Sequence, residues 1–122
     1  MAIWADTQTS ENLYTSVVVL AEIRFGILQV TDSEFRSELE QWLDNELRAG
    51  YAERLLPLNE SVIVRWREMV ERGRKANHTF SQPDLFLAAQ ADLHGLTVVT
   101  RNIRDFTVAG VPVINPWEFK TE

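Results

Sequence analysis

The chain has 122 residues, of which 45% are hydrophobic and 25% charged, which predicts one folded domain over residues 1–122 and excludes a fibrous or disordered chain. Its net charge of −6 argues against binding nucleic acid through a basic surface alone, although an acidic site could still meet nucleic acid through metal ions. The absence of cysteine excludes disulfides, a cysteine nucleophile and a thiolate zinc site. No apolar run is long enough for a membrane span and no signal peptide is recognisable, so we expect a cytoplasmic protein without membrane contact.

The predicted elements begin with a short strand at residues 13–16, which turns near Ser16 into a mostly apolar helix at residues 17–28. Adjacent valines favour a strand at this point, whereas the Leu-Ala-Glu-Ile-Arg segment that follows favours a helix. Residues 32–49 predict an amphipathic helix, because apolar side chains recur on one helical face with charges opposite. Gly50 is a suitable stop for this helix.

The second half of the chain alternates in the same way. Residues 55–58 are apolar but interrupted by proline, which predicts an edge strand. Residues 60–76 predict an amphipathic helix, residues 83–94 a helix buried on most sides, and residues 96–100 and 111–114 two further strands. Strands alternating with helices predict an α/β fold with a mostly parallel sheet, whose ligand site lies beyond the carboxyl ends of the strands.

Acidic and amide side chains at three places are candidates for chemistry. Glu22 interrupts an apolar segment, where a buried carboxylate is costly unless it is paired or bound to a metal; the alternative is a carboxylate at the surface or beside an arginine. Asp84 opens the most apolar helix three residues after Ser81, a position that helix capping explains without any function. Asn102 and Asp105 follow a predicted strand, either as a polar turn or as residues of a site at the strand's carboxyl end.

Together, these positions suggest more than each does alone. Oxygen ligands gathered at one end of a parallel sheet can hold Mg²⁺ or Mn²⁺, and such ions activate water for phosphodiester cleavage. Sequence spacing alone does not show that the three places converge. His78, in a polar loop, and His94, at a helix end, are assigned no role.

Four segments carry a pattern beyond these single residues: VLAEIRFGI at residues 19–27, SQPDLFLAA at residues 81–89, LTVVTRNIRDF at residues 96–106 and GVPVINPWE at residues 110–118. In this order they resemble the PIN-domain family, in particular its VapC-type toxin ribonucleases, and the last segment resembles the FitB-like branch. The resemblance covers nearly the whole chain. Each segment alone is weak, but four in the right order are a strong sign.

The resemblance implies a PIN-like three-layer α/β/α fold and a Mg²⁺-dependent (or Mn²⁺-dependent) endoribonuclease that hydrolyses RNA. It implies the toxin of a type II toxin–antitoxin pair, a homodimer held inactive by a small antitoxin protein. By the same resemblance, Glu22, Asp84 and Asp105 are metal ligands. Asn102 corresponds to a position at which some relatives have aspartate, and its amide offers only a neutral oxygen. The resemblance therefore implies that Asn102 and Asp105 share this catalytic role, and that Thr100 helps to orient the site.

The start of the chain departs from the family pattern. The family begins with a strand that carries a first aspartate ligand, followed by a helix, and neither motif is found here. Residues 3–8 resemble the end of that helix and its loop, so Asp6 does not correspond to the missing ligand. We therefore expect an N-terminally truncated PIN-like domain with exposed central strand edges and weakened metal binding.

This departure leaves other hypotheses open. One is a non-catalytic degenerate PIN domain that acts as an antitoxin-binding or dimerisation module, and another is a remnant that does not fold cooperatively. For the ribonuclease hypothesis, the arginines nearest the motifs are candidates for positioning RNA, with solvated surface charge as the plainer explanation: Arg24, Arg101 and Arg104.

Overall fold

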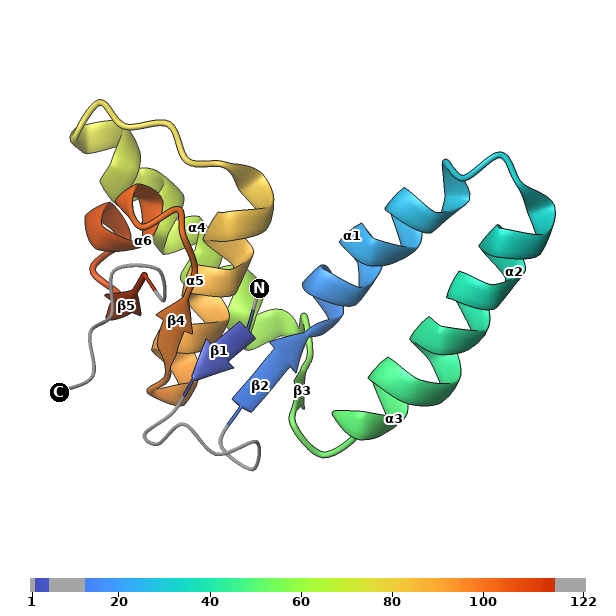
Figure 1. Ribbon diagram of the computed structural model, residues 1–122. Helices are drawn as coiled ribbons and strands as arrows, with labels where there is room; N and C mark the ends of the chain where they lie inside the picture. The colour runs from blue at the N-terminus through green and yellow to red at the C-terminus, as the bar shows by residue number, and fades with distance from the viewer. Residues whose placement is uncertain (1, 5–12, 116–122) are drawn as a thin grey trace, which may run out of the picture.

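The computed structural model describes residues 2–4 and 13–115 (Figure 1). The strands are β1 (Ala2–Trp4), β2 (Leu13–Ser16), β3 (Leu55–Leu56), β4 (Thr97–Val99) and β5 (Val113–Ile114). The helices are α1 (Val17–Leu28), α2 (Ser33–Trp42), the π-helical turn η2 (Leu43–Leu47), α3 (Arg48–Gly50), α4 (Glu60–Lys75), α5 (Gln82–His94) and α6 (Arg104–Ala109). Within the described ranges, none of these helices combines the length and the apolar character needed to cross a bilayer.

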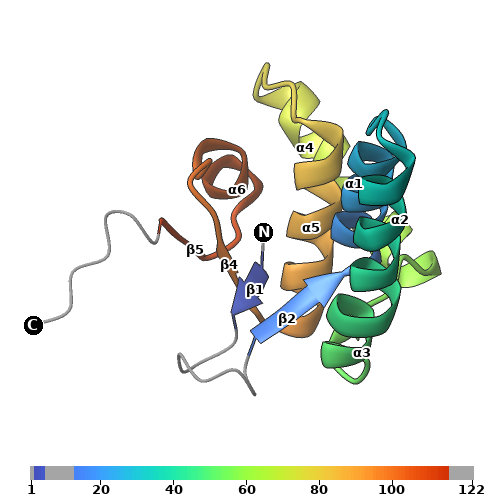
Figure 2. The ribbon, with the colours of Figure 1, turned by 45° about the vertical axis from the view of Figure 1, so that its right-hand side comes forward.

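The sheet has the strand order β3-β2-β1-β4-β5. β2 pairs with β3 and β4 pairs with β5 in parallel, while β1 is antiparallel to both of its neighbours. All strands except β1 therefore run in one direction, which confirms the α/β fold with a mostly parallel sheet. Figures 1 and 2 show α4 and α5 on one face of the sheet, and Figure 1 shows α1 and α2 projecting to the side of β2 and β3.

The centre of the sheet differs from the expectation. The sequence predicted that central strand edges are exposed and that residues 3–8 are a helix end and a loop; residues 5–8 of that segment lie outside the described residues. Instead, Ala2–Trp4 forms a strand whose Ile3 stands opposite both Tyr14 of β2 and Val98 of β4. β1 thus covers the edges of both β2 and β4. An unpaired strand edge presents free N–H and C=O groups, which can pair with an extended segment such as Ala2–Trp4.

The first helices begin where the sequence predicted. Ser16 is the N-cap of α1, and its Oγ accepts the Val18 N–H at 2.9 Å. Asp32 caps α2 in the same manner, accepting the backbone N–H groups of Glu34 and Phe35. Residues 33–50 are helical throughout, as predicted, but the π-helical turn η2 interrupts the α-helical hydrogen bonding.

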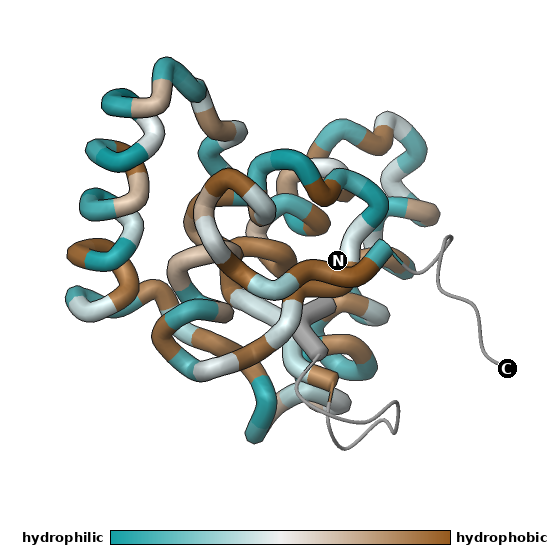
Figure 3. The backbone as a smooth tube through the Cα atoms, turned by 90° about the vertical axis from the view of Figure 1, so that its left-hand side faces the viewer, coloured by the Kyte–Doolittle hydropathy of each residue, from teal (hydrophilic) through white to brown (hydrophobic). Residues whose placement is uncertain are grey.

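The core has two parts. The larger part fills the space between α4, α5, α6 and the sheet, and its fully buried side chains include Val62, Met69, Leu85, Val98 and Phe106. The smaller part joins α1 to the following helices through Leu20, Ile27 and Leu43. In Figure 3 hydrophobic segments lie in the middle of the molecule, and hydrophilic residues are frequent on the outer turns of the helices.

Two local features around the later helices differ from the sequence prediction. Residues 101–105 were predicted to be a polar turn, but α6 begins within them at Arg104, because Phe106 and Ala109 bury their side chains in the core. Ser81 has the extended backbone of an N-cap of α5, yet its hydroxyl makes no capping hydrogen bond, so the predicted capping box with Asp84 does not form. The end of α5 at Gly95, with a left-handed φ of 66°, is as predicted.

Gly73→Ala in α4 is expected to destabilise the fold by about 1–3 kcal/mol, although alanine normally favours a helix. A Cβ at residue 73 would lie 2.3 Å from Phe80 Cε2 and 3.1 Å from the His78 carbonyl oxygen, so the loop before α5 would have to move. Gly26→Ala in α1 is the matched control, because nothing lies within 4 Å of its added Cβ. Urea unfolding should show a loss of stability for the first variant and none for the second.

Candidate functional site

Two of the predicted acidic residues line one cavity between α1 and α5. This acidic cavity has a volume of about 330 Å³ and is lined by Val18, Val19, Glu22, Ile23, Pro83, Asp84 and Leu87. Glu22 is exposed, as the surface alternative predicted, and Asp84 is half-buried. The N-cap at Ser16 sets the start of α1 and hence where Glu22 lies, while Asp84 lies in the first turn of α5.

Asn102, which follows β4, contacts one of the two acidic residues of this cavity, Asp84. Its Nδ2 donates a hydrogen bond to Asp84 Oδ2 at 2.9 Å. Its backbone N–H donates to the Oγ1 of Thr100, which lies directly after β4, at 3.1 Å. The carboxyl end of β4 therefore brings Asn102 to Asp84, and Thr100 orients it.

Asp105 is bonded to the loop that leads into α5. Its Oδ1 accepts a hydrogen bond from His78 Nε2 at 2.9 Å, and its Oδ2 accepts the Ser81 N–H at 3.0 Å. The side chains of His78 and Asp105 are 15% and 14% exposed, so this hydrogen bond is largely shielded from water. Both carboxylate oxygens of Asp105 are thus directed at the loop before α5.

Electrostatics couple the two aspartates. Burial raises the pKa of the Asp84 carboxyl above its ordinary value, and the negative charge of Asp105 adds to this effect. The hydrogen bond from Asn102 acts in the opposite direction and is the smallest of the three influences. Asp84 is therefore a carboxylate whose negative charge is incompletely compensated by the protein.

The predicted site residues meet in pairs and not as one cluster. Glu22 and Asp84 share a cavity, Asn102 binds Asp84, and Asp105 binds His78. In the part of the chain that the structure describes, no group of three or more histidine, aspartate or glutamate side chains could hold a metal ion.

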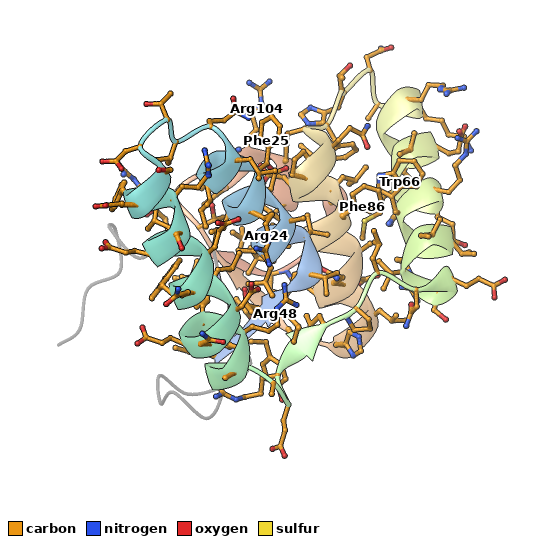
Figure 4. All side chains as sticks on the ribbon, turned by 90° about the vertical axis from the view of Figure 1, so that its right-hand side faces the viewer. Arg24, Phe25, Arg48, Trp66, Phe86 and Arg104 are labelled. Carbon is orange, nitrogen blue, oxygen red and sulfur yellow. The ribbon has the colours of Figure 1, made fainter. Side chains whose placement is uncertain are left out.

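An apolar groove adjoins the acidic cavity. It has a volume of about 510 Å³ and is lined by Val17, Val18, Ala21, Glu22, Leu58, Gln82, Pro83 and Phe86. Phe86 stacks on Trp66 of α4 with ring centroids 5.0 Å apart (Figure 4). Because Glu22 and Pro83 line both spaces, the apolar groove leads directly to the acidic pair.

The arginines near the motifs lie in different settings. Arg24 forms an ion pair with Asp44, which also lies near Arg48, and thus links α1 to the turn after α2 (Figure 4). The hydrogen bond from Arg24 lowers the pKa of the Asp44 carboxyl. Arg101 and Arg104 are exposed and lie on either side of Asn102 in the chain.

Comparison with known protein families identifies the family of this chain. The profile of the PIN domain matches residues 2–111. The chain belongs to the PIN-domain family. Its sequence is 31% identical to the VapC ribonuclease Y4jK of Sinorhizobium fredii over 94% of this chain and 82% of the relative. It is 30% identical to the toxin FitB of Neisseria gonorrhoeae over 93% of this chain and 82% of the relative.

Solved structures of PIN domains are also similar. The crystal structure of FitAcB from Neisseria gonorrhoeae matches with a TM-score of 0.86 and 29% identity, over 93% of this chain and 82% of that chain. VapBC-5 from Mycobacterium tuberculosis, a member of the VapBC family of toxin–antitoxin systems, matches with a TM-score of 0.67 and 27% identity, over 84% and 80% of the two chains. The predicted family and PIN-like fold are thereby confirmed.

The sequence did not indicate a role for His78 in this PIN domain. His78 lies in the loop between α4 and α5, and its hydrogen-bond partner Asp105 is 27 residues away in the chain. No periodicity or spacing rule joins two such positions. The resemblance of residues 96–106 to a PIN-domain motif was the signal that pointed to Asp105 and so to this region.

The raised pKa of Asp84 predicts the pH dependence of this PIN domain's stability without metal. The folded chain holds the Asp84 proton more tightly than the unfolded chain. The contribution of Asp84 to the free energy of unfolding therefore falls as the pH rises from 3.8 through the raised pKa. Asp84→Asn removes the ionisation and is expected to raise stability at neutral pH but to have little effect at pH 4. Thermal unfolding in EDTA at both pH values measures this; equal stability of the two proteins at both would contradict it.

Proposed function

We propose that this chain is a Mg²⁺- or Mn²⁺-dependent endoribonuclease and the toxin of a type II toxin–antitoxin pair. The observation that carries the proposal is the meeting of Glu22 and Asp84 on one open cavity, with Asn102 hydrogen-bonded to Asp84. Similarity to a VapC ribonuclease and to the toxin FitB supports the reaction class. RNA as substrate also agrees with the proposed location in the cytoplasm.

The donor set fits a hard divalent cation. Mg²⁺ typically keeps several waters and binds through one or two carboxylates together with substrate phosphates, so Glu22 and Asp84 are sufficient as its protein ligands. The incompletely compensated charge of Asp84 is what a cation would neutralise. When bound, such an ion polarises the scissile phosphate and activates water.

The remaining residues act on the ligands. Asn102 donates to one oxygen of Asp84 and so fixes how that carboxylate is turned, and Thr100 fixes Asn102 through its backbone N–H. Arg101 and Arg104 are exposed residues that lie close to Asn102 in the chain, so we expect their positive charges to attract the RNA backbone. Their contribution is expected to weaken with added salt, as phosphate contacts do.

The test is cleavage of a mixed single-stranded RNA substrate by the purified chain. Circular dichroism first establishes that the chain is folded, and the assay is run in Mg²⁺, in Mn²⁺ and in EDTA. Endonucleolytic cleavage in either metal that EDTA abolishes is the expected result. A folded chain that cleaves no RNA in either metal would overturn the enzymatic proposal.

The proposed antitoxin occupies the apolar groove and the acidic cavity together. Val17, Ala21, Leu58 and Phe86 offer an apolar surface that ends at the negative charges of the acidic cavity. A partner segment with apolar side chains followed by a lysine or arginine complements this order. The bound antitoxin should prevent Mn²⁺ from binding at the acidic cavity. An antitoxin that binds the chain without reducing its Mn²⁺ binding would contradict this placement.

In the proposed homodimer, the interface is formed by helices α1 and α2. Phe25 and Leu28, at the far end of α1, are 63% and 56% exposed, and Phe35 and Trp42 of α2 are also exposed. Exposed large apolar side chains on neighbouring helices are what a dimer interface would cover. Sedimentation equilibrium of the wild-type chain and of Phe25→Ser tests this, with a dimer expected only for the wild type.

A second function is favoured by one specific observation. The apolar groove lined by Val17, Ala21, Leu58 and Phe86 offers a surface for a partner whether or not a metal binds at the acidic cavity. This non-catalytic antitoxin-binding or dimerisation module predicts partner binding by a folded chain without RNA cleavage. The cleavage assay above distinguishes the two functions.

A further inference from the structure

The loop before α5 is attached to the rest of the domain at several points. The His78 N–H donates to the Gly73 carbonyl oxygen at 2.8 Å, and the His78 ring packs edge-on against Phe80 with centroids 4.6 Å apart. Phe80 is 8% exposed and lies against Gly73. Contacts with Gly73 of α4 and with Phe80 therefore hold the His78 imidazole in place independently of its bond to Asp105.

Asp105 connects this loop to the first turn of α5. Its carboxylate joins His78 Nε2 to the Ser81 N–H, and the Ser81 carbonyl in turn accepts the Leu85 N–H at 3.0 Å. Because an ionised carboxylate only accepts hydrogen bonds, Nε2 carries the proton of this bond. Asp84 lies within the helical turn that these bonds hold.

Asp105 contributes no surface to the acidic cavity. Among the described residues, the carboxylates that line that cavity are Glu22 and Asp84, and each oxygen of Asp105 instead accepts a hydrogen bond from the loop. We propose that His78 and Asp105 together position Asp84, and that Asp105 is a positioning residue of this site and not a metal ligand. This rests on the proposed metal site at Glu22 and Asp84, and it assigns Asp105 differently from the sequence-based expectation.

The first test separates the hydrogen bond of His78 from its packing. His78→Phe keeps an aromatic ring beside Phe80 but removes the bond to Asp105, whereas His78→Gln can keep an N–H donor near the position of Nε2. His78→Phe is expected to lower the Tm of the metal-free chain by about 4 °C. It should weaken Mn²⁺ binding, measured by calorimetry with the metal alone, about tenfold. His78→Gln should restore most of both properties, which a purely space-filling role would not predict.

The second test compares the two aspartates in the metal-free chain. Asp105→Ala removes two hydrogen bonds and should lower the Tm, whereas Asp84→Asn relieves an incompletely compensated charge and should raise it. The double variant His78→Phe with Asp105→Ala should be no less stable than Asp105→Ala alone, because both changes break the same bond.

The opposite pattern would overturn the proposal. If Asp105 is a ligand, Asp105→Asn weakens Mn²⁺ binding as much as Asp84→Asn, and His78→Phe leaves Mn²⁺ binding unchanged. A metal-free Tm that Asp105→Ala leaves unchanged would show that the hydrogen bonds of Asp105 do not hold the start of α5. A wild-type chain that binds no Mn²⁺ would contradict the proposed metal site itself. The metal-free Tm values would still decide whether the His78–Asp105 pair holds the start of α5.

Discussion

Asp84→Asn is expected to lower the rate of RNA cleavage by about a hundred- to a thousandfold, the loss typical of removing one group that stabilises the transition state. Asparagine keeps the size of the side chain and can still accept the hydrogen bond from Asn102, so the cavity should keep its shape. What is lost is the negative charge that would hold the cation beside Glu22. Initial rates at saturating Mn²⁺, with the same RNA for both proteins, measure the effect.

Asp92→Asn is the matched control for this prediction. Asp92 lies on the same helix, α5, but forms an ion pair with Arg65 of α4 and faces a different surface. The same chemical change there should leave cleavage within about twofold of the wild type, because partly exposed ion pairs contribute little to stability. Equal rates for wild type and Asp84→Asn, or equal losses in both variants, would show that Asp84 has no special role.

Phe106→Ala is expected to be the most destabilising single substitution, with a loss of about 3–5 kcal/mol in the free energy of unfolding. Phe106 has no exposed surface and fills the core between α4, α5 and the sheet, directly after Asp105 in α6. A loss of this size is a large part of the stability of an ordinary domain, so much of the chain could be unfolded at 37 °C. Urea titration followed by circular dichroism measures it.

Val108→Ala tests whether this loss comes from the core and not from α6 itself. Val108 is on the same short helix but is 43% exposed, so its truncation should change stability by no more than about 0.5 kcal/mol. Comparable losses for the two variants would contradict the packing described here.

Features set by neighbouring residues could be predicted from the sequence. The start of α1 at Ser16 follows from a hydroxyl that caps the next turn, and the end of α5 follows from Gly95, which adopts a left-handed φ. The edge position of β3 follows from Pro57, which lacks the N–H that a central strand needs. Each of these signals acts within a few residues, where sequence patterns are most informative.

Features set by distant contacts could not be predicted. β1 is a strand only because β2 and β4 offer unpaired edges on both sides, and three residues carry too little pattern to reveal this. α6 forms because Phe106 finds a place in the core. In both cases, tertiary contacts decide a segment whose local preference is weak.

The candidate site shows the same division. The residue types at Glu22, Asp84 and Asn102 suggested metal chemistry, and the family resemblance brought these residues together. The sequence could not show that Asn102 binds Asp84, or that Asp105 turns toward His78. Those contacts depend on how the loops after β4 and before α5 meet, which no spacing along the chain determines.

The central claim is that a divalent cation binds at Asp84, and Mn²⁺ tests it directly because the electron paramagnetic resonance signal of the free ion decreases on binding. Titration of the wild-type chain should show one bound Mn²⁺ per chain, with binding lost in Asp84→Asn, weakened in Glu22→Gln and kept in Asp92→Asn. Mn²⁺ binding that is absent from the folded wild type, or that survives unchanged in Asp84→Asn, would contradict the account.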